Sequence, residues 1–218
     1  MWRFSGKNII AIILYVTFFY PVNAQNEWRL KKEQSGIKIF MRTNHNSSFN
    51  EIKVEMNIRA TLSSLTALLL DVPNHSHWVY NVKTSYILKK VAENELFFYE
   101  LIDSPFPASD RDLAVHLKIT EEAETKVLNI TATGLPGYIP QKKNIVRVPV
   151  SNENWKVTPI SGNTLQIEYF LEIDPGGSVP AWLINNFAEK GPYESFRHLQ
   201  EQVDKPKYKN AEVSFIRN

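Results

Sequence analysis

The chain has 218 residues, of which 43% are apolar, 12% aromatic and 22% charged, and it contains no cysteine. This composition is too apolar and aromatic for a disordered protein, and a chain of this length fits one domain. The absence of cysteine excludes a disulfide framework, a thiolate zinc site, an iron–sulfur cluster and a cysteine nucleophile.

The first 24 residues have the three parts of a secretory signal peptide. Arg3 and Lys7 form a short positive region, an apolar run from Ile9 to Tyr20 follows, and small residues lead to Ala24. The run is shorter than the roughly 20 residues that a membrane-spanning helix needs. We therefore predict a leader over residues 1–24, cleavage after Ala24 and an exported protein, periplasmic or secreted. An uncleaved anchor and a buried helix are the alternatives.

Removal of this leader changes the charge of the protein. The full chain has 25 basic and 23 acidic residues, a formal charge of +2. The leader contains Arg3 and Lys7 and no acidic residue, so 25 minus 2 leaves 23 basic residues against 23 acidic ones. A neutral protein lacks the positive field that attracts phosphate backbones, and we expect no nucleic-acid partner.

Beyond the leader, apolar and polar residues alternate, which is the pattern of half-buried β-strands. The pattern is clearest at 51–58 and 165–174. Weaker versions occur at 36–42, 80–90, 95–102, 112–120, 126–133, 144–150 and 154–160. Short connections favour antiparallel pairing. We predict an α+β domain over residues 25–205 with about nine strands, and a frayed C-terminal tail over residues 206–218.

Two segments follow helical spacing instead. Leucines repeat at helical intervals over 62–69, directly after Thr61, which is placed to cap a helix. A second helix opens at Pro180, and the Gly-Pro pair ending at Pro192 interrupts it before a second half resumes. A curved antiparallel sheet wrapped around this broken C-terminal helix would enclose a cavity. A solid core is the alternative.

Three local motifs, in this order along the chain, resemble those of a known family. The first is PFPASDRD at 105–112, a proline-rich loop ending in Arg-Asp. The second is Val146-Arg147-Val148 with Trp155 and Pro159, and the third is DPGGSVPAWLIN at 174–185. Together they resemble the START family of lipid-transfer domains, which have the helix-grip fold, and the resemblance covers essentially the whole mature chain.

This resemblance implies a protein without enzymatic activity or cofactor that binds or transfers one lipid or other hydrophobic small molecule. The ligand would lie between the sheet and the C-terminal helix, and transfer would involve transient membrane contact. Two alternatives stay open: a helix-grip enzyme of the polyketide cyclase or aromatase kind, and a protein-interaction module without a usable cavity. The oligomeric state is open as well.

Candidate cavity residues follow from strand alternation combined with the resemblance. Leu113, Val115 and Leu117 share one face of a predicted strand. Several START members place a basic residue further along this strand, where this chain offers Leu117, and this difference favours a ligand that is mostly hydrocarbon. The other candidates are Arg147, Tyr169, Leu171, Trp182 and Phe187. Tyr169 would either present its hydroxyl to the ligand or be an ordinary core tyrosine.

The motifs also contain candidate structural residues, which are Arg111, Asp112, Gly176, Gly177 and Pro180. Arg111 and Asp112 would be costly to bury unpaired, so each requires a charged or backbone partner. Arg111 and Asp112 therefore either fix the loop conformation or hold a polar head of the ligand. The two glycines supply backbone freedom before the helix, as a turn or as a hinge.

Catalytic motifs are missing from the sequence: it contains no nucleophile elbow, Walker loop, HExxH or dinucleotide fingerprint. His75 and His77, near Asp71, have a spacing that suits a metal, but we favour a solvated turn because a metal site requires three or four converging ligands. Glu100 lies on a strand with apolar residues on both faces, so its direction stays open. We predict no metal, no cofactor and no catalytic constellation.

Overall fold

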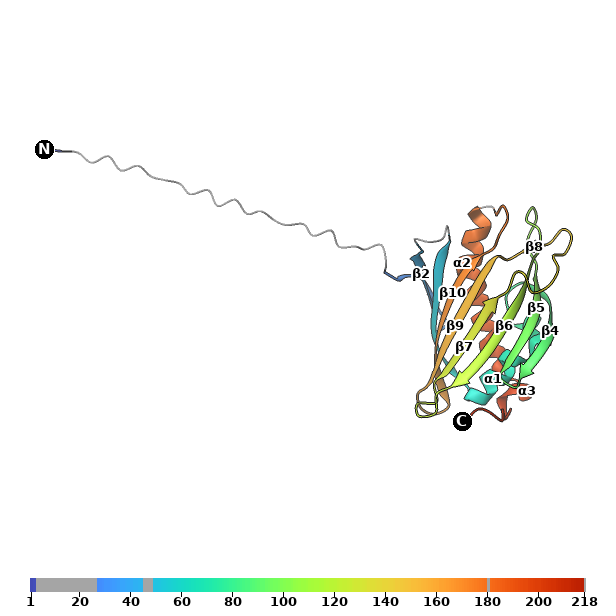
Figure 1. Cartoon of the computed structure of the whole chain (residues 1–218). Helices are drawn as coiled ribbons and strands as arrows, with labels where there is room; N and C mark the ends of the chain where they lie inside the picture. The colour runs from blue at the N-terminus through green and yellow to red at the C-terminus, as the bar shows by residue number, and fades with distance from the viewer. Residues whose placement is uncertain (3–26, 45–48, 180, 218) are drawn as a thin grey trace.

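A curved β-sheet wraps around a long C-terminal helix (Figure 1). The computed structural model describes residues 1–2, 27–44, 49–179 and 181–217. The leader predicted at 1–24 thus lies outside the described residues apart from its first two, and so does Pro180. No helix in the described part of the chain is long and apolar enough to cross a membrane.

Ten strands form the sheet. They are β1 Arg29–Gln34, β2 Ile37–Thr43, β3 Asn50–Arg59, β4 Val82–Ala92, β5 Glu95–Ile102, β6 Arg111–Glu121, β7 Leu128–Gly134, β8 Val146–Arg147, β9 Val150–Pro159 and β10 Thr164–Asp174. Nine of them pair antiparallel in the order β1-β2-β3-β10-β9-β7-β6-β5-β4. The two-residue β8 adds a short parallel pairing to β6. The helix-grip prediction of a curved antiparallel sheet with a C-terminal helix is confirmed.

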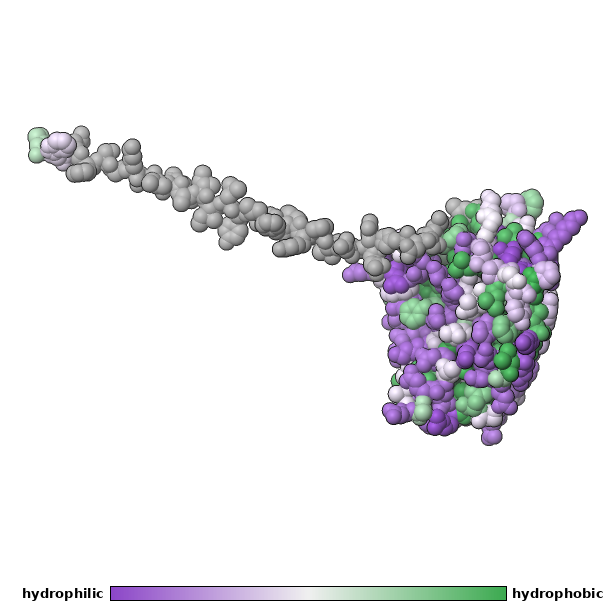
Figure 2. Space-filling model, viewed as in Figure 1, coloured by the Kyte–Doolittle hydropathy of each residue, from purple (hydrophilic) through white to green (hydrophobic). Residues whose placement is uncertain are grey.

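Alternation along the central strands separates an inner face from an outer face. In β3, Ile52 and Val54 are buried, and in β10 so are Leu165 and Ile167, while their sequence neighbours are less buried. Hydrophilic side chains cover most of the outer face of the sheet (Figure 2). The inner face needs an apolar partner, and the helices supply it.

In the described part of the chain, three α-helices and one 3₁₀ helix cover the inner face or one end of the sheet. They are α1 Leu62–Leu70, the 3₁₀ helix η2 Val72–His77, α2 Ala181–Val203 and α3 Pro206–Lys209. Thr61 caps α1 as predicted, since its hydroxyl accepts a hydrogen bond from the Ser64 backbone amide at 3.1 Å. This cap satisfies one of the free amides at the start of the helix.

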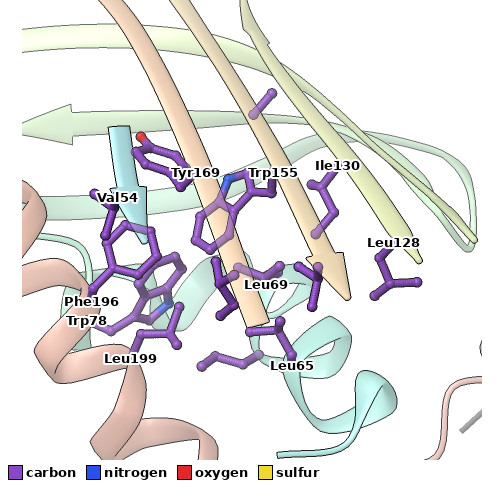
Figure 3. Packing of buried hydrophobic residues seen from close by; sticks show 14 of the residues in the cluster. Val54, Leu65, Leu69, Trp78, Leu128, Ile130, Trp155, Tyr169, Phe196 and Leu199 are labelled. Atoms are coloured by element: carbon purple, nitrogen blue, oxygen red, sulfur yellow. The ribbon is translucent and has the colours of Figure 1, made fainter. Parts of the chain in front are cut away.

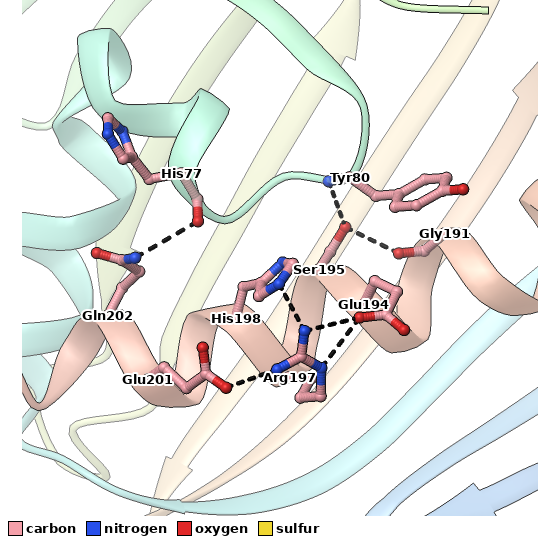
Figure 4. A network of polar contacts seen from close by, with 9 residues as sticks. All are labelled: His77, Tyr80, Gly191, Glu194, Ser195, Arg197, His198, Glu201 and Gln202. Atoms are coloured by element: carbon pink, nitrogen blue, oxygen red, sulfur yellow. Dashed lines mark hydrogen bonds and ion pairs between the residues drawn. The ribbon is translucent and has the colours of Figure 1, made fainter. Parts of the chain in front are cut away.

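The helix α2 runs without a break through Pro192, so the interruption predicted there does not end it. Proline removes one backbone donor from a helix. Within the same stretch, the hydroxyl of Ser195 donates to the Gly191 carbonyl at 2.9 Å and accepts from the Tyr80 amide at 3.0 Å (Figure 4). These bonds tie the middle of α2 to the segment after η2.

The core lies where α2 meets the sheet. The ring of Phe196 on α2 lies 5.0 Å from that of Trp155 on β9 and 5.1 Å from that of Tyr169 on β10, centroid to centroid (Figure 3). Leu199, one turn later on α2, is fully buried. It belongs to the same buried apolar cluster as Leu65 of α1. The regularly spaced apolar residues in the second half of α2 therefore face the sheet.

The C-terminal segment packs against the domain instead of fraying. Tyr208 is buried, and its hydroxyl donates to Asp71 at 2.7 Å, while the Lys207 ammonium pairs with the same carboxylate. Further on, Ile216 is buried and the Arg217 amide donates to Glu121 at 2.7 Å. The prediction of a frayed tail after residue 205 is therefore wrong, because the tail covers α1 and the end of β6.

Candidate functional site

A cavity of about 460 Å³ lies between the inner face of the sheet and α2. Most of its wall is apolar, with Ile52 and Ile130 from the sheet, Leu69 from α1, and Ile184 and Phe187 from α2. This size falls within the usual range of small-molecule sites, which are concave and mostly apolar. The alternative of a solid core does not hold for this region.

Most of the predicted cavity residues lie on this wall. Leu113, Leu117, Tyr169, Leu171 and Phe187 all line the cavity. Val115 and Trp182 are not among the lining residues that the structure describes. Val115, although on the same strand as the two leucines, packs within the buried cluster and does not line the cavity. The side chain of Trp182 lies outside the described part of the structure.

Arg147 is not a cavity residue, and this part of the prediction is wrong. Its guanidinium donates to both carboxylate oxygens of Asp112, at 2.7 and 3.1 Å, and to three carbonyls of residues 136–140. The two side chains are 8% and 0% exposed. The next residue, Val148, lines the cavity instead. The hydrogen bond from Arg147 to Asp112 raises the pKa of Arg147.

Arg111 both braces a loop and faces the cavity. Its guanidinium donates to the Ser109 carbonyl and, at 3.5 Å, to the Gly176 carbonyl. Burial lowers the pKa of Arg111, and the charge of Asp110 opposes this effect. Arg111 therefore fixes the loop conformation and also lines the cavity, and a contact with a ligand head stays a prediction.

The glycine pair before α2 forms a tight turn. Gly176 and Gly177 have φ angles of +66° and +62°, a region that favours glycine. A Cβ on Gly176 would lie only 2.9 Å from the Pro149 ring and 3.1 Å from the Arg147 carbonyl. The turn therefore requires glycine for both its conformation and its close packing against the loop after β8.

His75 lies inside the domain and not in a solvated turn, which corrects the sequence prediction. It is 4% exposed. Its Nδ1 lies 2.7 Å from Oε1 of Glu100 and its Nε2 lies 3.0 Å from the Leu69 carbonyl. Burial lowers the pKa of His75, but the hydrogen bond and charge of Glu100 outweigh this, so that the pKa is raised. The direction of Glu100, left open by the sequence, is therefore inward.

Glu153 is the cavity residue that the sequence analysis missed. It lies on β9, lines the cavity and interacts with the Tyr169 hydroxyl on β10. Burial and the charge of Glu100 raise its pKa to about 7, whereas Tyr169 and His75 act in the opposite direction. Burial, followed by the charge of Glu153, raises the pKa of Tyr169.

Four polar side chains therefore meet on a largely apolar wall: His75, Glu100, Glu153 and Tyr169. We call them the inner polar cluster. Within the described residues, no group of three or more histidine or acidic side chains is arranged to hold a metal ion. The cluster can accept and donate hydrogen bonds and can exchange a proton, in surroundings shielded from bulk water.

The arrangement of sheet, helix and cavity agrees with the sequence comparison. The START domain model matches residues 22–209 of the chain. The chain belongs to the START domain family. The family resemblance drawn from the three motifs is thereby confirmed.

Three relatives show how this START domain compares with known proteins. An uncharacterized protein of Pseudomonas aeruginosa is 28% identical over 197 residues, covering 90% of this chain and 96% of that protein. The phosphatidylcholine transfer protein of Rattus norvegicus is 25% identical, covering 78% of this chain and 81% of its own. The crystal structure of a STAR-related lipid transfer protein fragment from Xanthomonas axonopodis superposes with a TM-score of 0.75 at 26% identity, covering 82% and 99% of the two chains.

Proposed function

We propose that this START domain binds one lipid or similar hydrophobic molecule in its cavity and carries it without catalysing a reaction. The observation that carries the proposal is the cavity of about 460 Å³, with a largely apolar wall, between the sheet and α2. The lipid-transfer names of two similar proteins support it. Each 100 Å² of apolar ligand surface removed from water would contribute about 2.5 kcal/mol to binding.

The protein would act outside the cytoplasm, after removal of the leader at residues 1–24. The three parts of a signal peptide in the sequence support this part of the proposal. A direct measurement is the N-terminal sequence of the protein recovered from its host. It should begin just after Ala24, and a chain that retains the leader would contradict export by cleavage.

Loading and release would occur where two loops flank the turn before α2, at residues 103–110 and 135–145. Phe106, on the first loop, is 93% exposed, and Tyr138, on the second, is 42% exposed. Exposed aromatic side chains are suited to brief insertion into a membrane interface. We propose transient membrane contact through these loops while the ligand enters or leaves.

A helix-grip enzyme is the second candidate, because the inner polar cluster brings a histidine, two carboxylates and a phenol together within the cavity. Such groups can act as general acids and bases. The two candidates differ in the fate of the ligand. A carrier returns the molecule with its mass unchanged after incubation, whereas an enzyme of this kind returns a product of different mass or connectivity.

The test is native mass spectrometry of protein purified from its host, followed by identification of the released molecule. Ala188→Trp would fill the cavity from α2, where Ala188 lines it, and should abolish the adduct. Ala123→Trp adds the same ring at an exposed turn and should retain it. Wild-type protein that is always empty, and stays empty with a broad lipid panel, would overturn the proposal.

A further inference from the structure

The inner polar cluster contains a proton whose position is restricted by its partners. The Leu69 carbonyl can only accept a hydrogen bond, so Nε2 of His75 carries a proton and donates it at 3.0 Å. The other nitrogen, Nδ1, lies 2.7 Å from Glu100. One further proton lies between these two atoms, whether the pair is a charged histidine with a carboxylate or a neutral histidine with a carboxylic acid. In both forms the pair is neutral.

Glu153 is left as the acidic group that this pair does not balance. The Tyr169 hydroxyl interacts with it and can occupy at most one acceptor position, whereas a carboxylate has two oxygens and about four such positions. The charge of Glu100 disfavours the ionised form of Glu153, and the charge of His75 favours it. An ionised Glu153 therefore offers free acceptor positions to whatever fills the cavity.

Among the described residues, two cationic side chains line the cavity: Lys31 on β1, which is exposed, and Arg111 on β6, which is buried and has its own partners. Arg111 directs its guanidinium to the Ser109 and Gly176 carbonyls in the loops that flank the turn before α2. Leu113 and Leu117, further along β6, are apolar. Among the β6 residues that line the cavity, Arg111 is therefore the one with a positive charge, and it lies at the start of the strand.

We propose that the polar head of the ligand is a hydrogen-bond donor without negative charge, a hydroxyl or an ammonium group, and that Glu153 accepts its hydrogen bond. This inference rests on the proposed function, since it assumes that the cavity holds a ligand. A carboxylate or phosphate head at this place would lie beside Glu153 and the neutral His75–Glu100 pair, with no cation in the inner polar cluster to balance its charge, which is costly in a poorly hydrated site. An alcohol satisfies the free acceptor, and an ammonium adds charge pairing.

Three probes with the same hydrocarbon chain test this preference: oleyl alcohol, oleylamine and oleate. Binding to delipidated protein at pH 8 is followed through the fluorescence of Trp78 and Trp155, which line the cavity. The alcohol and the amine should each bind about tenfold or more tighter than oleate, which is the usual effect of one hydrogen bond to a charged group. Comparing the alcohol with the amine separates hydrogen bonding from charge pairing, since only the amine carries charge.

The variant Glu153→Gln keeps the shape of the side chain and removes its charge. It should reduce the advantage of oleylamine over oleate by about tenfold or more. Glu168→Gln, on the outer face of β10, is the matched control and should leave all three affinities unchanged. Lowering the pH of the wild type from 8 to 5.5 protonates Glu153 and should reduce the advantage of the amine over the alcohol.

Two results would overturn the inference, and they are distinguishable. Oleate that binds wild type as tightly as the alcohol, or a preference order that Glu153→Gln leaves unchanged, overturns the donor-head inference while the carrier function stands. Failure of all three probes to bind, together with the absence of any adduct in native mass spectrometry, overturns the carrier function and the inference with it.

Discussion

Replacing Glu153 by glutamine removes an ionisable group from the cavity wall and keeps a group that can accept a hydrogen bond from Tyr169. The change therefore isolates the cost of ionising Glu153 inside the folded domain. Burial and the charge of Glu100 raise the pKa of Glu153 from its ordinary 4.5 to about 7. In the unfolded chain these influences are lost, so Glu153 ionises at lower pH there than in the folded protein.

The sign and size of the effect on stability follow from linkage. Because the folded pKa is the higher one, the stabilising contribution of the protonated side chain is fully present below about pH 4.5. It is lost progressively as the pH rises through 7. At about 1.4 kcal/mol per pKa unit, the loss by pH 8.5 is roughly 3 kcal/mol. Glutamine does not titrate, so Glu153→Gln should be more stable than wild type by about this amount at pH 8.5 and nearly equal to it at pH 4.5.

Urea unfolding of delipidated protein between pH 4.5 and pH 8.5 measures this difference directly. The gap between Glu153→Gln and wild type should grow as the pH rises from about 4.5 to about 7 and level off above that. Glu168→Gln removes a carboxylate from the outer face of the next strand, β10, and is the matched control for the loss of a carboxylate outside the cavity. A gap for Glu153→Gln that is absent at pH 8.5, or that does not change with pH, would refute the placement of this carboxylate in a poorly hydrated cavity.

Two further predictions concern the loops that flank the cavity. Asp112→Asn should lower the free energy of unfolding by about 3–5 kcal/mol, because it leaves the Arg147 charge buried without its partner. In urea titrations the exposed control Asp204→Asn should cause no measurable change, and equal effects of the two would contradict the argument. Gly176→Ala should cost at least about 1 kcal/mol more than Gly162→Ala, since both have positive φ but only the first would also collide with a proline ring. Equal thermal unfolding shifts would show that the close packing is relieved elsewhere.

The sequence predicted the strands well where one face is buried. The alternation over 51–58 and 165–174 corresponds closely to β3 and β10, which are paired partners in the sheet. β1 was missed because Arg29–Gln34 is exposed along almost its whole length and shows no apolar periodicity. It is held by backbone pairing to β2. The packed tail was missed for a related reason, since Tyr208 is buried by a contact with Asp71, far away in the sequence.

The apolar part of the cavity could be predicted, but its polar cluster could not. Strand alternation placed Leu113 and Leu117 on one face, and the START resemblance indicated that this face lines the cavity. Glu153 was missed because strands were predicted at 144–150 and 154–160, which placed it in a gap, whereas β9 begins at Val150. Counting back by two from the buried Trp155 would have given it an inward position. His75 gave no periodic signal, because it lies on a short 3₁₀ helix whose direction depends on tertiary packing.

These two omissions are connected through charge balance in the cavity. Glu100 requires a positive or hydrogen-bonding partner because it is buried, and along β6 neither Leu113 nor Leu117 can provide one. The partner is His75 on η2, and this pairing occupies its Nδ1. Glu153 then has no second histidine or other cation within the inner polar cluster, and burial together with the charge of Glu100 raises its pKa to about 7. The charge of the cavity, and with it the head group that the cavity accepts, depends on whether Glu153 is protonated, although most of the wall is apolar.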